Sequence, residues 1–145
     1  MTIYGVYEVN ELMMSEFSRN IIGKTGDTPP ENISSALAEK FPGAINIEWT
    51  HKSKYFEALF YLDQIEYIAI FSPGADLMEY RMFLPEDYLP ASIRKKLSAL
   101  GEIMNAVLIN KGNRIIYEII YRDADLNRYI VYLTNLGRII KKELL

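Results

Sequence analysis

The only tryptophan and the only histidine of the chain lie close together, in the segment Trp49-Thr50-His51. A Ser-His-Asp triad would have to use His51 as its base, yet no serine lies in a G-x-S-x-G elbow. The basic segment Lys52-Ser53-Lys54 follows directly. We therefore interpret His51 as an exposed turn residue and Trp49 as a core or rim aromatic. The alternative for Trp49 is an anchor for a binding partner.

Oxygen ligands lie at alternate positions in Asp123-Ala124-Asp125-Leu126-Asn127, as they do at the start of a calcium loop. The rest of that pattern is missing, because the sixth position is Arg128 in place of glycine and the twelfth is Thr134 in place of glutamate. We predict a hairpin turn and no metal site. The alternative is a cation site formed by Asp123, Asp125 and Asn127.

Other catalytic patterns are also incomplete. The chain has no cysteine, which excludes disulfides, thiol catalysis and zinc–thiolate sites. Glu57 and Glu118 occupy matching places in the two halves of the chain. Glycoside hydrolysis needs its carboxylates in a cleft, whereas both of these are expected on a solvated face. The phosphate-binding patterns G-x-G-x-x-G and G-x-x-x-x-G-K-[ST] are absent. We therefore expect a protein that is not an enzyme and that uses no cofactor.

The composition is that of an ordinary globular domain of 145 residues, half of them hydrophobic. The formal net charge is −3, whereas nucleic-acid-binding proteins usually carry a basic surface. We interpret the short clusters Arg94-Lys95-Lys96 and Lys141-Lys142 as solvated surface. No apolar run reaches the roughly 18 residues of a membrane span. The N-terminus does not read as a signal peptide, so the sequence as it stands predicts a cytoplasmic protein, or a periplasmic one if a signal was trimmed.

Two helices and two sets of strands are expected to position these residues. Thr28-Pro29-Pro30-Glu31 has the pattern of a capped helix start, and that helix stops at Pro42-Gly43. The second helix begins near Leu89-Pro90 and ends at Gly101. Alternating apolar residues predict strands over 44–50, 55–62, 65–71 and 76–84, and again over 105–110, 114–122, 128–134 and 137–143. In the first strand, Ile45, Ile47 and Trp49 are expected on one face.

The two halves match each other at offsets of 60 to 63 residues, which predicts an internal repeat. The predicted fold class is therefore α+β: a tandem repeat of helix plus antiparallel strands, with the helices packed on one face of an antiparallel sheet. Residues 1–28 are expected to be an N-terminal extension with a helix from about Asn10 to Ile22. Residues 29–145 are expected to form a single domain of two repeats, about 29–88 and 89–145.

These segments resemble the PepSY-like family, which is also described as β-lactamase-inhibitor-like. The resemblance covers roughly residues 29–145 and rests on Phe41-Pro42-Gly43-Ala44 leading into Ile47-Glu48-Trp49, on Leu89-Pro90 followed by Ile93 and Leu97, and on the strand-ending Gly74 and Gly137. It implies a tandem helix-plus-strand fold and an exported bacterial binding module without catalytic residues. The chain departs from the family in its N-terminal segment and in lacking a recognisable signal peptide.

The strand face opposite the helices is less polar than a solvated face should be. Such a patch commonly marks a binding surface, so we predict that a protein partner, or a second copy in a homodimer, docks on it. The predicted anchors are Trp49, Tyr55, Leu59, Tyr61, Ile116 and Ile120, and the predicted rim is His51, Lys52, Lys54, Glu57 and Glu118. Alternatively, residues 1–27 cover this face, or the protein is a small-molecule or cation sensor.

Overall fold

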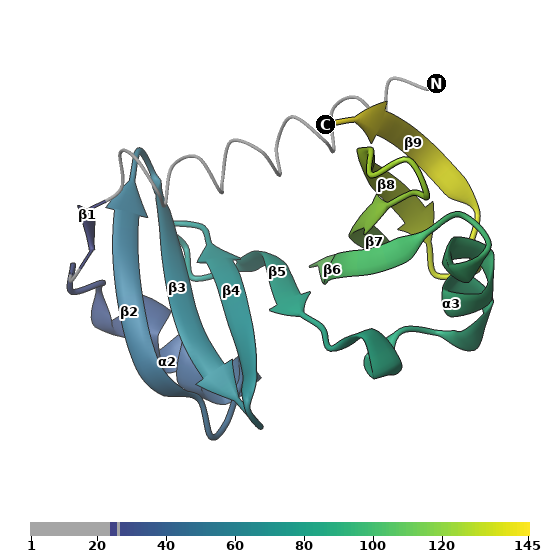
Figure 1. The fold of residues 1–145 in the computed structure, drawn as a ribbon. Coiled ribbons are helices and arrows are strands. Elements are labelled where there is room, and N and C mark those ends of the chain that lie inside the picture. Colours follow the sequence, from purple (N-terminus) through teal and green to yellow (C-terminus); the bar gives the residue numbers. More distant parts are fainter. Residues whose placement is uncertain (1–23, 26) are drawn as a thin grey trace. The chain divides into compact units, whose positions relative to one another are not determined.

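The computed structural model describes residues 24, 25 and 27–145, and side chains from residue 27 onward (Figure 1). These residues divide into two compact units, the first ending at Arg81 and the second comprising Met82–Leu145. Each unit is described by itself. The helix predicted from about Asn10 to Ile22 lies outside the described residues. The same holds for nearly all of residues 1–27, which were proposed as a cover for a sheet face.

The first unit consists of a short helix and antiparallel strands that follow one another in chain order. Its elements are β1 (Lys24–Thr25), α2 (Glu31–Lys40), β2 (Ile45–Lys52), β3 (Tyr55–Leu62), β4 (Ile65–Phe71) and the greater part of β5 (Leu77–Phe83). β2 pairs with β1 on one side and with β3 on the other, and β3 pairs with β4. Tight turns join β2 to β3 and β3 to β4, as the alternating sequence predicts.

The second unit begins with the end of β5 and a 3-10 turn at Glu86–Tyr88, and it then has the same kinds of element. They are α3 (Ala91–Ser98), β6 (Glu102–Lys111), β7 (Arg114–Arg122), β8 (Arg128–Thr134) and β9 (Ile139–Leu144). β6 pairs with β7, β7 with β8, and β8 with β9, all antiparallel. The predicted strand ranges agree with the observed ones to within two residues, except that β6 begins three residues earlier than predicted.

Each helix buries its apolar stripe against one face of the neighbouring strands. Ile33 and Leu37 of α2 belong to a core cluster with Ala58, Phe60 and other residues of β2 to β4. In the second unit, Ile93 and Leu97 of α3 belong to a corresponding cluster with residues of β6 to β8. The opposite face of the strands is called the helix-free face below.

The predicted capping of the first helix is wrong. α2 begins at Glu31, and Pro30 rather than Thr28 occupies the N-cap position without a side-chain hydrogen bond. α3 begins in the same way after Pro90. A proline at this position has no N–H to leave unpaired and has its φ angle set by its ring. The prolines, Pro29-Pro30 in the first helix and Pro90 in the second, were therefore the informative part of the pattern, and the helices start one or two residues later than predicted.

The predicted fold class is also wrong. The described structure is 52% strand and only 18% helical, and its two α-helices have ten and eight residues. It is a mostly antiparallel β structure and not an α+β tandem repeat of helix-plus-strand units. Proline and glycine residues indicated where the helices begin and end, but they did not indicate how little of the chain these short helices contribute beside strands that mostly have six to ten residues.

Gly101 provides a test of the packing between the end of α3 and the β7–β8 turn. Its N–H donates to the Leu97 carbonyl, and a Cβ atom at this position would lie 2.2 Å from the Arg122 carbonyl oxygen. We expect Gly101→Ala to lower the free energy of unfolding in urea by about 1–3 kcal/mol, because the backbone must move apart. Gly74→Ala is the control, since its Cβ would meet nothing closer than 3.7 Å. Equal stability of the two variants would contradict the packing described.

Candidate functional site

The segment that holds Trp49 and His51 is a strand that leads through a tight turn into a second strand, as predicted. His51 lies near the end of β2, just before that turn, and its exposed ring stacks on Phe56 with the centroids 4.2 Å apart. Its backbone N–H donates to the Asp27 carboxylate at 2.9 Å. The His51 side chain is therefore occupied in a stacking contact on the strand surface.

Trp49 lies on the helix-covered face of β2. It is 9% exposed and belongs to the core cluster around α2. Its ring centroid is 6.1 Å from that of Phe71, and its position in the ladder is opposite the buried Ala58. The structure thus places Trp49 as a core aromatic, on the opposite side of the sheet from Tyr61.

A β-bulge changes which residues of β2 share a face. Ile45 lies opposite Tyr61 and Glu48 lies opposite Leu59, so β2 contains one more residue than β3 over this stretch. Asn46 has a φ of 54°, a left-handed conformation that asparagine tolerates better than most residues. The prediction that Ile45 shares a face with Trp49 is therefore wrong. The bulge places Ile45 beside Tyr61 on the helix-free face.

Ile45 and Tyr61 form an exposed apolar pair with carboxylates around it. Their side chains are 59% and 38% exposed. The Tyr61 hydroxyl donates to the Glu66 carboxylate at 3.0 Å, and this hydrogen bond, together with the negative charges of Glu66 and Glu48, raises the pKa of Tyr61. We call Ile45, Glu48, Leu59, Tyr61 and Glu66 the Tyr61 patch. Sequence reasoning found Leu59 and Tyr61 but missed Ile45. The available signal for the bulge was Asn46, a residue that tolerates a left-handed conformation, between two isoleucines.

Two further predicted anchors, Leu59 and Tyr55, also lie on β3. Leu59 is half-buried and lies opposite the fully buried Ile68. Tyr55, at the other end of β3, is 38% exposed, and Lys54 places its Nζ 5.6 Å from the Tyr55 ring centroid. Lys52 and Glu57 of the predicted rim are half-buried. Tyr55, Leu59 and Tyr61 are thus brought to one face of one strand.

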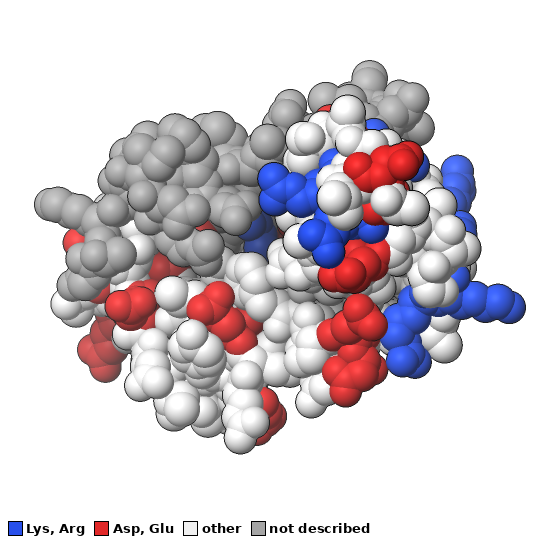
Figure 2. Space-filling view, viewed as in Figure 1, with Lys and Arg blue, Asp and Glu red and all other residues white. Residues whose placement is uncertain are grey.

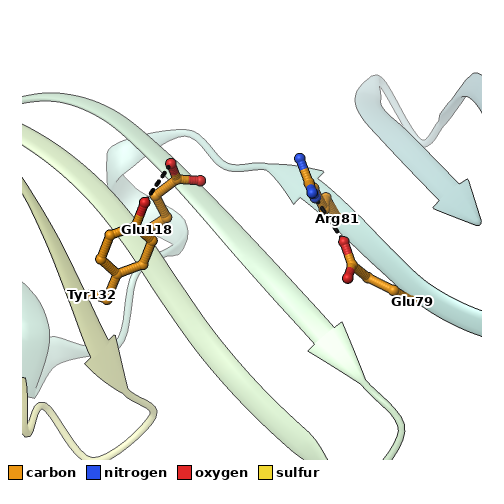
Figure 3. A network of polar contacts seen from close by, with 4 residues as sticks. All are labelled: Glu79, Arg81, Glu118 and Tyr132. Atoms are coloured by element: carbon orange, nitrogen blue, oxygen red, sulfur yellow. Dashed lines mark hydrogen bonds and ion pairs between the residues drawn. The ribbon is translucent and has the colours of Figure 1, made fainter. Parts of the chain in front are cut away.

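The remaining predicted residues belong to the second unit. Ile116 is only 3% exposed and lies opposite Ile109, which is fully buried. Ile120 is half-buried. Glu118, between them on the same face, accepts a hydrogen bond of 3.4 Å from the Tyr132 hydroxyl (Figure 3). The helix-free face of β7 is therefore largely buried, contrary to the exposure that its predicted role as a docking surface assumed.

A buried ion pair in β5 was not anticipated from the sequence. The Arg81 Nε and a Glu79 carboxylate oxygen are 2.8 Å apart, and both side chains are almost completely buried (Figure 3). Their i, i+2 spacing puts both on one face of the strand, and this spacing was the signal available in the sequence.

The segment Asp123–Asn127 is a turn stabilised by its own carboxylate. An Asp123 oxygen accepts the N–H groups of Asp125 and Asn127, both at 2.9 Å, and Leu126 takes a left-handed φ of 66°. The predicted hairpin turn is confirmed. Across residues 27–145, no group of three or more His, Asp or Glu side chains is placed to hold a metal ion. Within the described part of the chain, no helix is long and apolar enough to cross a membrane.

The fold of this chain is similar to that of several proteins of known structure. No family model and no curated protein matches it. A protein from Bacteroides eggerthii that was provisionally assigned to the periplasm superimposes with a TM-score of 0.72 at 19% identity, covering 81% of this chain and 90% of the other. A DUF2874 family protein from Bacteroides ovatus gives a TM-score of 0.71 at 20% identity, with coverage of 82% and 89%.

A BLIP-like protein from Bacteroides fragilis is similar to the same extent. It superimposes with a TM-score of 0.71 at 17% identity and covers 82% of this chain and 88% of its own. The chain therefore has the fold of these proteins. The β-lactamase-inhibitor-like side of the predicted resemblance is supported at the level of fold, whereas membership of the PepSY family is not shown.

The Tyr61 patch leads to a prediction about ionisation. Replacing Glu66 by glutamine removes the charge that favours the protonated phenol, so the pKa of Tyr61 should fall toward that of a free tyrosine. The raised pKa means that Tyr61 contributes stability below its unfolded pKa of about 10, and that this contribution is lost as the pH rises through the folded value. The pKa is read from the ¹³Cζ chemical shift of Tyr61 against pH. Glu39→Gln, on α2, is the control; a Glu66→Gln variant with an unchanged Tyr61 pKa would contradict the interaction.

Proposed function

We propose that this protein is a non-catalytic binding module and that a partner protein docks on the Tyr61 patch. The observation that carries the proposal is the direct pairing of Ile45 with Tyr61, both exposed on the helix-free face. An aromatic side chain beside an aliphatic one offers a rigid apolar anchor of the kind that dominates the binding energy of interfaces. The bulge at Asn46 presents Ile45 at a place where regular pairing would have turned it toward α2.

The charges around the patch indicate the chemistry of the partner. Glu48 and Glu66 both act on the Tyr61 hydroxyl, and residues 27–81 contain nine Asp or Glu against four Lys or Arg. A partner that offers an apolar pocket with Lys or Arg at its rim would match both features. Such charge complementarity increases the rate of association and makes it sensitive to salt. A specific interface needs about 1,000 Å² in total, so the contact must extend beyond the patch along β3.

The similar structures support a binding role and an exported location. The B. fragilis neighbour is described as BLIP-like, and an inhibitor-like protein acts by binding another protein. The B. eggerthii neighbour was provisionally assigned to the periplasm, and we propose the same compartment for this chain.

The predicted roles of Trp49 and Ile116 as anchors are not retained, because Trp49 lies in the core cluster and Ile116 is buried.

The proposal is tested by photo-crosslinking in the native cells. A benzophenone amino acid replaces Tyr61 in one variant and Leu126 in another; Leu126 is 71% exposed in a turn of the second unit. We expect a discrete protein adduct from position 61 and none of the same mass from position 126. Adducts that are the same at both positions, or absent from both, would contradict a docking site at the Tyr61 patch.

The adduct's protein partner is then purified and titrated against the unlabelled chain. Ile45→Ser should weaken binding by about ten-fold or more, because an anchor is lost. Its melting temperature should remain near that of the parent, because Ile45 is exposed. Leu126→Ser is the matched control and should bind like the parent chain. Loss of binding accompanied by an equal loss of stability would place Ile45 in the structural core and not at a partner surface.

A further inference from the structure

Among the described strands of the second unit, β9 lies at an edge. Its strands lie in the order β6, β7, β8, β9, and β9 pairs with β8 on one side. No other described strand pairs with the outer side of β9. The Leu145 N–H donates to the Arg128 carbonyl at 2.8 Å. Because alternate residues of a strand direct their N–H and C=O groups to opposite sides, Lys142 and Leu144 direct theirs away from β8.

The side chains along this edge alternate in a definite pattern. Lys142 lies opposite Val131 and Leu144 lies opposite Tyr129, so both are on the face that α3 covers. The Lys142 Nζ is 4.7 Å from the Tyr129 ring centroid, which holds the cation over the strands. Leu144 is 63% exposed. The edge therefore presents a held cation and an exposed apolar side chain, next to outward-facing backbone donors and acceptors.

The second unit carries more basic than acidic residues, although Lys141 of β9 is ion-paired with Glu143 of the same strand. Residues 82–145 contain ten Lys or Arg and seven Asp or Glu, the reverse of the balance in residues 27–81. Arg94, Lys95 and Lys96 of α3 are exposed, and the Lys96 Nζ donates to the Gly137 carbonyl in the turn that precedes β9 at 2.6 Å. Lys and Arg side chains gather over this unit in the view of Figure 2.

We propose that β9 binds an extended acidic segment of a partner protein by β-strand addition. In this mode the main chain supplies hydrogen bonds and alternate side chains supply specificity. The fitting segment carries Asp or Glu opposite Lys142 and an apolar residue opposite Leu144. Lysine on an edge strand also discourages pairing with further copies of itself. Two antiparallel β9 strands paired about Lys142 would place the two Lys142 side chains opposite each other, which is destabilising, so the edge favours an acidic strand over a second copy.

The site is independent of the Tyr61 patch, because it lies in the other unit and would take an acidic rather than a basic partner. The test uses a fluorescein-labelled peptide with the sequence Thr-Glu-Thr-Val-Thr-Glu-Thr-Val, capped at its C-terminus, and its counterpart with lysine in place of glutamate. We expect the acidic peptide to bind at least about ten-fold more tightly than the basic one in fluorescence anisotropy at low salt. The largest amide chemical-shift changes should fall on β9.

A proline variant separates strand addition from simple charge attraction. Proline is tolerated in an edge strand where the N–H faces outward, so Leu144→Pro removes a docking donor and leaves the pairing with β8 in place. It should abolish peptide binding, while Leu144→Val, which keeps the donor, should bind like the parent chain. The melting temperatures of both variants should match that of the parent. The proposal is overturned if the acidic peptide does not bind at about 1 mM, if the basic peptide binds equally well, or if a folded Leu144→Pro binds like the parent.

Discussion

One extra residue in β2 determines which side chains reach each face of the strands in the first unit. The bulge between Ile45 and Glu48 lets Trp49 point into the core against Phe71, while Ile45 turns to the opposite face beside Tyr61. With regular pairing, both hydrophobic residues would compete for the space under α2, a ten-residue helix that buries only Ile33 and Leu37. The bulge thus limits the core to what a short helix can cover and leaves Ile45 outside it.

Much of the strand pattern could be predicted from the sequence, because alternation and turn residues act locally. Asp63-Gln64 and Ser53-Lys54 lie in the two turns as expected, and several of these residues have the positive φ angles of tight hairpins. The bulge could not be predicted from alternation, since a single added residue moves every earlier side chain to the other face. Proline and glycine residues likewise predicted the helices without predicting their small share of the fold.

The candidate site was predicted less well than the strands. The prediction assumed that the face opposite the helices is open, but Ile116 of β7 and Ile68 of β4 are buried. The sequence did carry a signal: Ile115-Ile116 and Ile119-Ile120 are adjacent apolar pairs, and continuous apolar runs are typical of strands buried on both faces. Among the predicted anchors, the exposed ones are Tyr55 and Tyr61 at the ends of β3, and the bulge adds Ile45 beside Tyr61.

Within each unit, the described strands pair with the next strand along the chain, mostly through tight turns. Residues that touch are therefore near one another in sequence, and closing a short loop costs little conformational entropy. Antiparallel β proteins with distant pairings fold slowly because the chain must find contacts far apart. A meander avoids that search: any hairpin that forms first is a template on which the following strand can be laid down, so each unit can assemble outward from a local nucleus.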